Sequence, residues 1–329
     1  MKNIAVLGCG VIASIMARTL REMSRKGAPI RLYAAAARSL ERAQAFCEKE
    51  GFEIAYGSYE ALVRDPAVDL VYIATPHSHP AQQAELCIKH GKAVLCEKAF
   101  TVNAQQARKV LAMAKERNVL VAEAIWPRYM PSRRIIRELL DSGAIGEPRL
   151  LTANLSGYAE DIRRIYDPAL AGGALLDVGI YPLTFMSMCF GDDIARIESS
   201  VQMFDTGVDR QETLTVHYPD GRMAVLFAGV SAPYPKTCMI CGAKGYLTVD
   251  YCANPREVKL YLTEENCAAA HEIPLPGQIS GYEYEIEACL RALEEGRIEC
   301  PEMPHSETIR MMELMDAIRA QWNMKYPIE

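Results

Sequence analysis

Short apolar runs alternate with amphipathic segments along the first 122 residues. Five runs, NIAVLG, IRLYAAA, VDLVYIAT, AVLCEK and VLVAEA, are almost entirely apolar, as buried strands are. The segments between them have helical apolar spacing: Val11 to Lys26, Leu40 to Glu50, HPAQQAELCIKHG, and a stretch that follows a cap at Asn103 and ends by Asn118. This alternation predicts an α/β domain with a doubly wound parallel sheet over residues 1–122.

The pattern changes after EAIWPRYMP, whose two prolines prevent a continuous helix. Alternating runs then follow closely, ARIESSVQMF, RQETLTVHYP, RMAVLFAG, TCMICGAKGYLTVDY and EVKLYLTEE, joined by PDG and AKG turns. They predict an α+β domain over residues 123–329 with a mainly antiparallel open sheet. Its uncovered face offers a surface for a homodimer or higher homo-oligomer. A last stretch, ETIRMMELMDAIRAQW, predicts a closing helix whose methionines belong to the core.

The charge and the apolar content of the chain limit the kinds of partner that we expect it to bind. The chain has 329 residues and a formal charge of -6, and no dense Lys/Arg stripe that would mark a nucleic-acid or anionic membrane surface. No run approaches the roughly 20 apolar residues that cross a bilayer, and the first strand begins without a signal sequence. We therefore expect a cytoplasmic protein that acts on small molecules.

The eleven cysteines are scattered, mostly within apolar runs, which favours reduced, buried thiols over disulfides. The one close pair, Cys238 and Cys241, lacks two further ligands at zinc spacing. We expect no metal site.

A glycine loop follows the first strand. Gly8, Gly10 and Ala13 form G-x-G-x-x-A and open a helix, with Val11 and Ile12 in its first turn. The two glycines permit a tight turn and close backbone approach to a pyrophosphate, and the helix N-terminus offers unpaired N–H groups. In a leading βαβ unit this pattern predicts a dinucleotide-binding Rossmann domain.

The end of the second strand indicates which dinucleotide binds. An acid that would hold the ribose hydroxyls of NAD is absent from Ile30 to Leu40. Arg38 and Ser39 stand there instead and suit the 2′-phosphate of NADP. The alternative is that Arg38 is a solvated first-turn residue, and NAD then remains a candidate cofactor.

Further polar residues follow the later strands of the same domain. Thr75, Pro76 and His77 can lie along a dinucleotide, and Glu97 and Lys98 end an apolar strand. Ligands of open parallel sheets bind beyond the carboxyl ends of the strands. Lys98 taken alone is equally well explained as a surface lysine.

Residues after the last strand of this domain are candidates of a second kind. Trp126 and Arg128 could contact nicotinamide or substrate through an aromatic face and a guanidinium. Arg163, Arg164 and Tyr166 precede a glycine-rich segment, but a solvated charge run explains them as well.

The segment GGALLDVGIYPL, Gly172 to Leu183, is small and apolar yet contains Asp177 and Tyr181. On a helix, residues four apart share one face. Taken singly, Tyr181 could be a hydrogen-bonded core tyrosine and Asp177 a cap or an ion-pair partner.

The motifs together resemble the Gfo/Idh/MocA oxidoreductases, through the glycine loop, ATPHS, CEK and GGALLDVGIY followed by a β-rich domain. EAIWPRYMP, GGALLDVGIYP and GYEYEIEACLRAL are most similar to the dimeric dihydrodiol dehydrogenase branch. The resemblance implies that Lys98 lies near the nicotinamide and the reacting carbon–oxygen bond, and that Asp177 and Tyr181 complete the catalytic set. Many members have histidine where this chain has Tyr181, and proline where it has Ala99; many also have histidine at Pro80.

The expected activity is an NADP(H)-dependent dehydrogenase or reductase that acts on CH–OH groups of a small polyol, sugar or cyclic diol. Tyrosine, with a reference pKa of about 10, suits the acid role directly and the base role if a cation such as Lys98 stabilises its phenolate. Asp177 would orient the pair or bind a substrate hydroxyl. We expect the substrate between the domains, with the small residues of the Gly172 segment allowing close approach. The alternative is a non-catalytic regulator of the same fold that binds dinucleotide and sugar.

Overall fold

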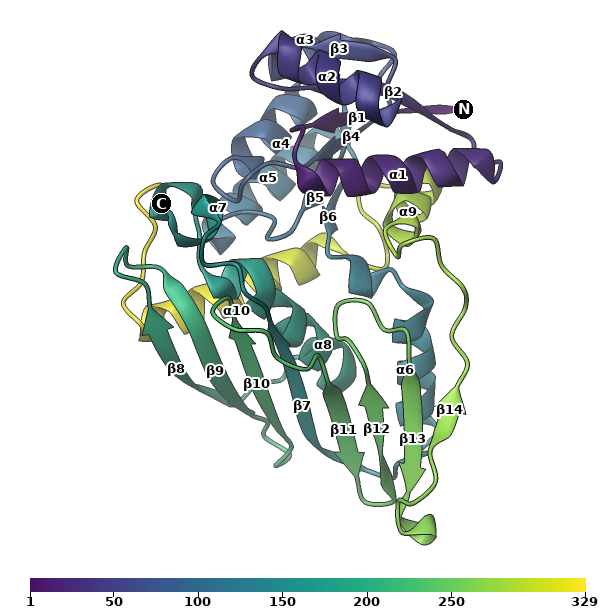
Figure 1. Ribbon diagram of the computed structural model, residues 1–329, viewed down its shortest axis with the longest axis vertical. Coiled ribbons are helices and arrows are strands. Elements are labelled where there is room, and N and C mark those ends of the chain that lie inside the picture. The colour runs from purple at the N-terminus through teal and green to yellow at the C-terminus, as the bar shows by residue number, and fades with distance from the viewer. The chain divides into compact units, whose positions relative to one another are not determined.

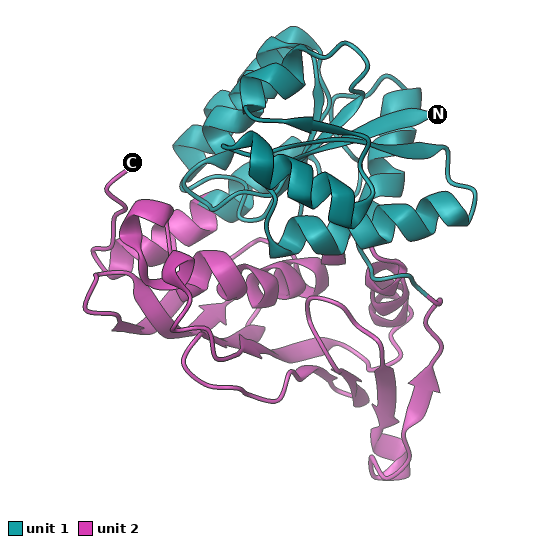
Figure 2. Cartoon of the chain, turned by 45° about the horizontal axis from the view of Figure 1, so that its top comes forward, with its two compact units in different colours: residues 1–125, 278–312 teal, residues 126–277, 313–329 magenta.

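The computed structural model describes residues 1–329, which form two compact units (Figure 2). Unit 1 comprises residues 1–125 and 278–312, and unit 2 comprises residues 126–277 and 313–329. The domains expected from the sequence, 1–122 and 123–329, differ from these units chiefly because residues 278–312 return to unit 1.

Unit 1 is built on a six-stranded parallel sheet (Figure 1). The strand order β3-β2-β1-β4-β5-β6 reverses direction between β1 and β4. This is the doubly wound Rossmann arrangement, and it confirms the predicted fold class of the first domain. The strands are β1 (Lys2–Leu7), β2 (Ile30–Ala36), β3 (Ile54–Tyr56), β4 (Leu70–Ile73), β5 (Ala93–Glu97) and β6 (Val121–Ala124).

The helices of unit 1 begin where polar side chains can cap them. The Asn103 side chain accepts a hydrogen bond from Gln106 N at 2.9 Å, as the sequence predicted, and Ser39 and Ser58 cap two other helices. The helices between strands are α1 (Val11–Arg25), α2 (Leu40–Glu50), α3 (Tyr59–Arg64), α4 (Pro80–Lys89) and α5 (Ala104–Arg117). Among the strands of this sheet and the helices between them, only β3 and α3 were not predicted, because three and six residues are too few to show a period.

The chain returns to unit 1 at its far edge. Val121 N donates to Ile298 O at 3.0 Å, and His305 Nε2 lies 2.9 Å from Val121 O. In the same returning segment, Ser280 Oγ lies 2.8 Å from Thr19 Oγ1, just before α9 (Glu283–Glu294). Because β6 is an edge strand, its backbone groups need partners, and the returning segment supplies them. Sequence periodicity carries no signal for such a long-range pairing.

Unit 2 is built on an eight-stranded sheet of order β14-β13-β12-β11-β7-β10-β9-β8. Only β7 and β10 pair in parallel, so the sheet is mainly antiparallel, as predicted. The strands are β7 (Pro148–Ser156), β8 (Arg196–Met203), β9 (Asp209–His217), β10 (Met223–Gly229), β11 (Cys238–Gly242), β12 (Gly245–Val249), β13 (Val258–Leu262) and β14 (His271–Ile273).

Helices accompany one face of this sheet. Helix α8 packs against β7 and β10, and α6 packs against α8 (Figure 1). Met311, Met312 and Met315 are buried, so the methionine stripe belongs to the core, as predicted. The helical elements are η1 (Trp126–Arg128), α6 (Pro131–Asp141), α7 (Arg163–Tyr166), η2 (Pro168–Leu170), η3 (Leu175–Gly179), α8 (Ile180–Phe190), η4 (Thr263–Glu265) and α10 (His305–Gln321), of which α10 runs from unit 1 into unit 2.

One helical stretch, Pro168–Phe190, is long and apolar enough to cross a membrane by length and composition alone. This corrects the expectation from the sequence that no apolar run is long enough to cross a bilayer. Of its most apolar window, 78% is buried inside the structure, as in the core helix of a globular fold.

Candidate functional site

The glycine loop of unit 1 has the geometry of a phosphate cradle. Gly8 has φ +95°, and a Cβ there would lie 2.7 Å from Ala74 O, so only glycine fits. Gly10 precedes α1, and a Cβ there would have no neighbour within 4 Å. The first turn of α1 contains no acid. Open space in front of an uncapped helix N-terminus suits the pyrophosphate of a dinucleotide.

Two arginines flank this loop. Arg38 and Ser39 are exposed after β2, and Ser39 Oγ accepts from Arg42 N at 3.2 Å. Arg42 Nη2 donates to Cys9 O at 3.3 Å, within the glycine loop itself. Burial raises the pKa of Tyr59, and the positive charges of Arg38 and Arg42 oppose this shift. Arg42 was missed in the sequence, although it stands one helical turn beyond Arg38.

Lys98 directly follows β5, beside a buried acid. Glu97 is 8% exposed; its Oε1 accepts from Tyr72 OH and its Oε2 accepts from Lys98 N at 3.2 Å. The Lys98–Ala99 peptide bond is cis, and Ala99 is fully buried. Lys98 itself is half-buried. The hydrogen bond that Lys98 N donates to the buried Glu97 carboxylate therefore holds the main chain at Lys98.

The remaining candidates of unit 1 lie at the same sheet edge. Thr75, Pro76 and His77 follow β4, and Thr75 Cγ2 would be 2.9 Å from a Cβ at Gly8. Thr75 Oγ1 donates to Gln83 Oε1 at 2.6 Å. Since all six strands are parallel, the residues after β1, β2, β4 and β5 share the carboxyl edge, where such sheets bind ligands.

In unit 2, Asp177 and Tyr181 lie at a change of helix type. Asp177 is in the π-helical turn η3, and Tyr181 is the second residue of α8. A regular helix was expected here; the wider turn alters the spacing between the two side chains, and such turns are frequent at functional sites. Asp177 Oδ1 accepts from Arg164 Nη1 at 2.8 Å, and Tyr181 is 9% exposed. Arg164 is thus an ion-pair partner of a candidate residue.

Trp126 and Arg128 form η1 at the start of unit 2. Both are buried, and Arg128 Nη2 donates to Ser187 Oγ at 2.8 Å, on α8. Their contact with a cofactor stays a prediction.

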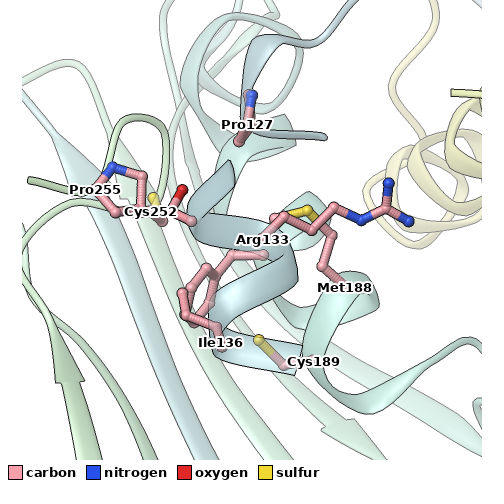
Figure 3. Close-up of a pocket in the computed structure, with 9 residues that line it drawn as sticks. Pro127, Arg133, Ile136, Met188, Cys189, Cys252 and Pro255 are labelled. Atoms are coloured by element: carbon pink, nitrogen blue, oxygen red, sulfur yellow. The ribbon is translucent and has the colours of Figure 1, made fainter. Parts of the chain in front are cut away.

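A small hollow of about 290 Å³, including space open to solvent, lies between α6 and α8 of unit 2 (Figure 3). Its lining includes Pro127, Met188 and Cys252, but neither Asp177 nor Tyr181. This hollow is therefore distinct from the candidate catalytic residues.

The glycines of the Gly172 segment make close contacts inside unit 2. A Cβ at Gly172 would lie 2.4 Å from Ile165 O, one at Gly173 2.1 Å from Asp209 Oδ1, and one at Gly179 2.5 Å from Glu212 Oε1. From the sequence, we expected these small residues to allow close approach to the nucleotide-binding domain. The structure gives them a packing role within their own unit.

The structure contains no group of three or more His, Cys, Asp or Glu side chains that could hold a metal ion. All eleven cysteines are free, and Cys238 and Cys241 lie in β11.

Comparisons with known proteins find similarity along nearly the whole chain. Residues 2–125 match the family model described as "Oxidoreductase family, NAD-binding Rossmann fold", and residues 134–248 match the "GFO/IDH/MocA C-terminal domain". The trans-1,2-dihydrobenzene-1,2-diol dehydrogenase of Bos taurus is 34% identical, covering 98% of this chain and 97% of the relative, and that of Homo sapiens is 33% identical with the same coverage.

Among solved structures, a 3-ketoreductase from Actinomadura kijaniata in complex with NADP and TDP-benzene superimposes with a TM-score of 0.86 at 27% identity, covering 97% of both chains. Forms of that enzyme with one tyrosine changed to phenylalanine or one lysine changed to alanine match similarly. An aldose-aldose oxidoreductase from Caulobacter crescentus shares the fold, with a TM-score of 0.85 at 20% identity over 97% of this chain and 96% of that chain.

The two loop glycines should respond differently to substitution. Gly10→Ala should change the free energy of unfolding by less than about 1 kcal/mol, because its Cβ meets no neighbour, yet weaken dinucleotide binding at least about tenfold by filling the cradle. Gly8→Ala should cost about 2 kcal/mol or more of stability through its positive φ and the clash with Ala74 O. Urea unfolding and fluorescence titration with NADPH measure both effects.

Gly157→Ala is the matched control, since Gly157 also has open space around it but lies in unit 2. Unchanged NADPH affinity in Gly10→Ala would contradict the assignment of the cradle.

Proposed function

Because the chain belongs to the Gfo/Idh/MocA family of NAD(P)-binding oxidoreductases, we propose that it transfers hydride between NADP(H) and a secondary alcohol or carbonyl of a small polyol, sugar or cyclic diol. The observation that carries the proposal is the position of Lys98. It follows β5 at the carboxyl edge of the sheet that also bears the glycine loop. We expect a cation at this edge of a dinucleotide-binding sheet to act on a substrate beside the cofactor.

The relatives support this class of substrate. The curated relatives are named for oxidation of a cyclic diol, and the 3-ketoreductase is named for reduction of a ketone. Both reactions interconvert an alcohol and a carbonyl at one carbon. We propose the same interconversion here, with the cyclic diol and the keto sugar as the first substrates to test.

NADP(H) is the proposed cofactor because two guanidiniums stand beside the glycine loop. Arg38 follows β2 and Arg42 contacts Cys9 O. Burial lowers the pKa of His79, and the positive charge of Arg38 lowers it further, so the positive field of Arg38 reaches His79. Such a field favours the extra phosphate of NADP over the bare ribose of NAD.

Three side chains have proposed roles in the chemistry. When bound, the nicotinamide supplies or accepts the hydride. Tyr181 would donate its phenolic proton to the carbonyl oxygen in reduction and take a proton from the alcohol in oxidation. The Lys98 ammonium would stabilise the negative charge on the phenolate or the substrate oxygen. Asp177, paired with Arg164, would accept a hydrogen bond from a neighbouring substrate hydroxyl.

We also propose a homodimer formed through the open face of the unit 2 sheet. Leu150, Met223 and Val225 are between 36% and 41% exposed, and Met223 is directly opposite Leu150 across β7 and β10. The Tyr246 and Tyr261 rings stack 4.7 Å apart on neighbouring strands. Contiguous apolar surface of this kind is typical of an interface, and a second copy of the same face satisfies two-fold symmetry.

Cofactor preference should depend on the two arginines. The double variant Arg38→Ala/Arg42→Ala should raise the Kd for NADPH by about 10- to 100-fold, because two charge-assisted contacts to the 2′-phosphate are lost, and should change the Kd for NADH by less than about threefold. Isothermal titration with both cofactors measures the preference. Wild-type protein that binds NADH more tightly than NADPH would overturn the NADP assignment.

Lys98→Ala and Tyr181→Phe should each lower kcat by about 100-fold or more, because each removes a group that acts in the transition state, while the Kd for NADPH stays within about threefold. Steady-state reduction of ketones, followed at the absorbance of NADPH, measures the effect.

Two control variants accompany this experiment. Lys115→Ala removes an exposed lysine of unit 1, and Tyr218→Phe removes a buried hydroxyl that donates to Gly191 O at 3.0 Å in unit 2. Both should retain wild-type kcat. Tight NADPH binding without turnover of any diol, polyol or keto sugar would instead favour the non-catalytic regulator.

Val225→Asp should convert the dimer to a monomer, because it places a charge in the apolar centre of the interface. Sedimentation velocity measures the change, with Ile328→Asp, an exposed apolar residue outside the sheet, as the control. A wild-type monomer, or a Val225→Asp dimer of unchanged affinity, would exclude this interface.

A further inference from the structure

The helical segment that contains Asp177 and Tyr181 begins without a cap from its own sequence. Neither η3 nor α8 donates a backbone hydrogen bond to the side chain of its own N-cap residue. The acceptor comes from another element: Asp209, the first residue of β9, accepts from Leu175 N through Oδ2 at 2.5 Å. An acid at a helix N-terminus binds its orphan N–H groups and interacts favourably with the helix dipole.

Asp209 can reach this position only because Gly173 has no side chain. Gly173 has φ +115°, and a Cβ there would lie 2.1 Å from Asp209 Oδ1. The preceding residue is fixed as well, since Tyr326 OH donates to Gly172 O at 2.6 Å. Asp209 and Tyr326 therefore hold the backbone on both sides of the point where the helical segment begins.

A second buried acid lies under the other end of the π-turn. Glu212 is 2% exposed and shares the buried face of β9 with Leu214 and Val216. A Cβ at Gly179 would be 2.5 Å from Glu212 Oε1, and neither oxygen of Glu212 has a hydrogen-bond partner. Burial, together with the charge of Asp209, raises the pKa of Glu212 well above its usual range.

The charge of Asp209 is partly compensated. Burial raises its pKa to about 6, and the amides of Leu175, Asp209 and Ala174 and the charge of Arg319 oppose the shift. Arg319 is 3% exposed and contacts Asp316 Oδ1 at 2.7 Å. The amide of Leu175, which donates to the Asp209 carboxylate, and the positive charge of Arg319 both favour its ionised form.

We propose that Asp209 is a positioning residue for the reaction: from β9 it caps the helical segment over residues 174–190 and fixes the π-turn that presents Asp177 and Tyr181. This inference rests on the proposed function, because it assigns Asp209 an effect on turnover. A misplacement of about 1 Å in a catalytic group can lower a rate by about 100-fold. Loss of the cap should therefore act on kcat through Asp177 and Tyr181, without touching the cofactor-binding residues of unit 1.

The test compares Asp209→Ala, Asp209→Asn and Leu247→Ala, with kcat expressed per folded molecule. Asp209→Ala removes the acceptor and should lower kcat by about 10- to 100-fold, with the Kd for NADPH within about twofold of wild type. Asp209→Asn keeps an oxygen that can accept from Leu175 N and should restore most of the rate. Leu247→Ala opens a cavity in β12, which three other strands separate from β9, and should lower Tm without lowering kcat.

Wild-type kcat in Asp209→Ala, or an equal fall in kcat for Leu247→Ala, overturns the positioning role. If Asp209→Ala does not fold, hydrogen exchange of the Ala174 and Leu175 amides in the wild-type chain still tests whether Asp209 caps the helical segment. Protection comparable to that of β9 is expected, and exchange at the rate of an open loop contradicts it. Absence of turnover in the wild-type protein would count against the proposed function alone, because the exchange result still decides whether Asp209 caps the segment.

Discussion

The candidate residues of each unit depend on main chain that leaves no room for a side chain. In unit 1, Gly8 packs against the carbonyl of Ala74, which brings the loops after β1 and β4 together. In unit 2, Gly172, Gly173 and Gly179 pack against Ile165, Asp209 and Glu212. A methyl group at any of these positions would displace backbone or a buried acid. The glycines therefore set where the chemistry-bearing residues can lie.

In each unit, a buried acid accepts a hydrogen bond from the main chain at or near a candidate catalytic residue. Glu97 receives the hydroxyl of Tyr72 and the amide of Lys98. Asp209 receives the amide of Leu175, two residues before Asp177. Charged hydrogen bonds in a low-dielectric interior are strong and directional, so they fix the backbone more tightly than apolar packing alone. Both units thus support functional side chains by hydrogen-bonding the neighbouring main chain to a buried carboxylate.

Local patterns predicted most of the fold and the resemblance predicted the candidate residues, whereas non-local contacts escaped both. Long strands and helices such as β2 and α2 show their period within the sequence, but the return of residues 278–312 to β6 depends on a pairing that no local pattern encodes. Glu212 could have been found, because it falls on the apolar positions of an alternating strand with Leu214 and Val216. Asp209 could not, since its role arises only when β9 meets Gly173 in the folded chain. Whether Lys98 and Tyr181 act together remains a prediction.

The central claim is that this chain moves a hydride between NADPH and the carbon of a carbonyl substrate. The most direct measurement uses NADPH deuterated at the transferred position of C4, with a panel of cyclic ketones and keto sugars, and mass spectrometry of the product. The account predicts one deuterium on the newly formed carbinol carbon and an oxidised cofactor in equal amount. NADPH that binds but is not oxidised, or an alcohol product without deuterium at that carbon, would contradict it.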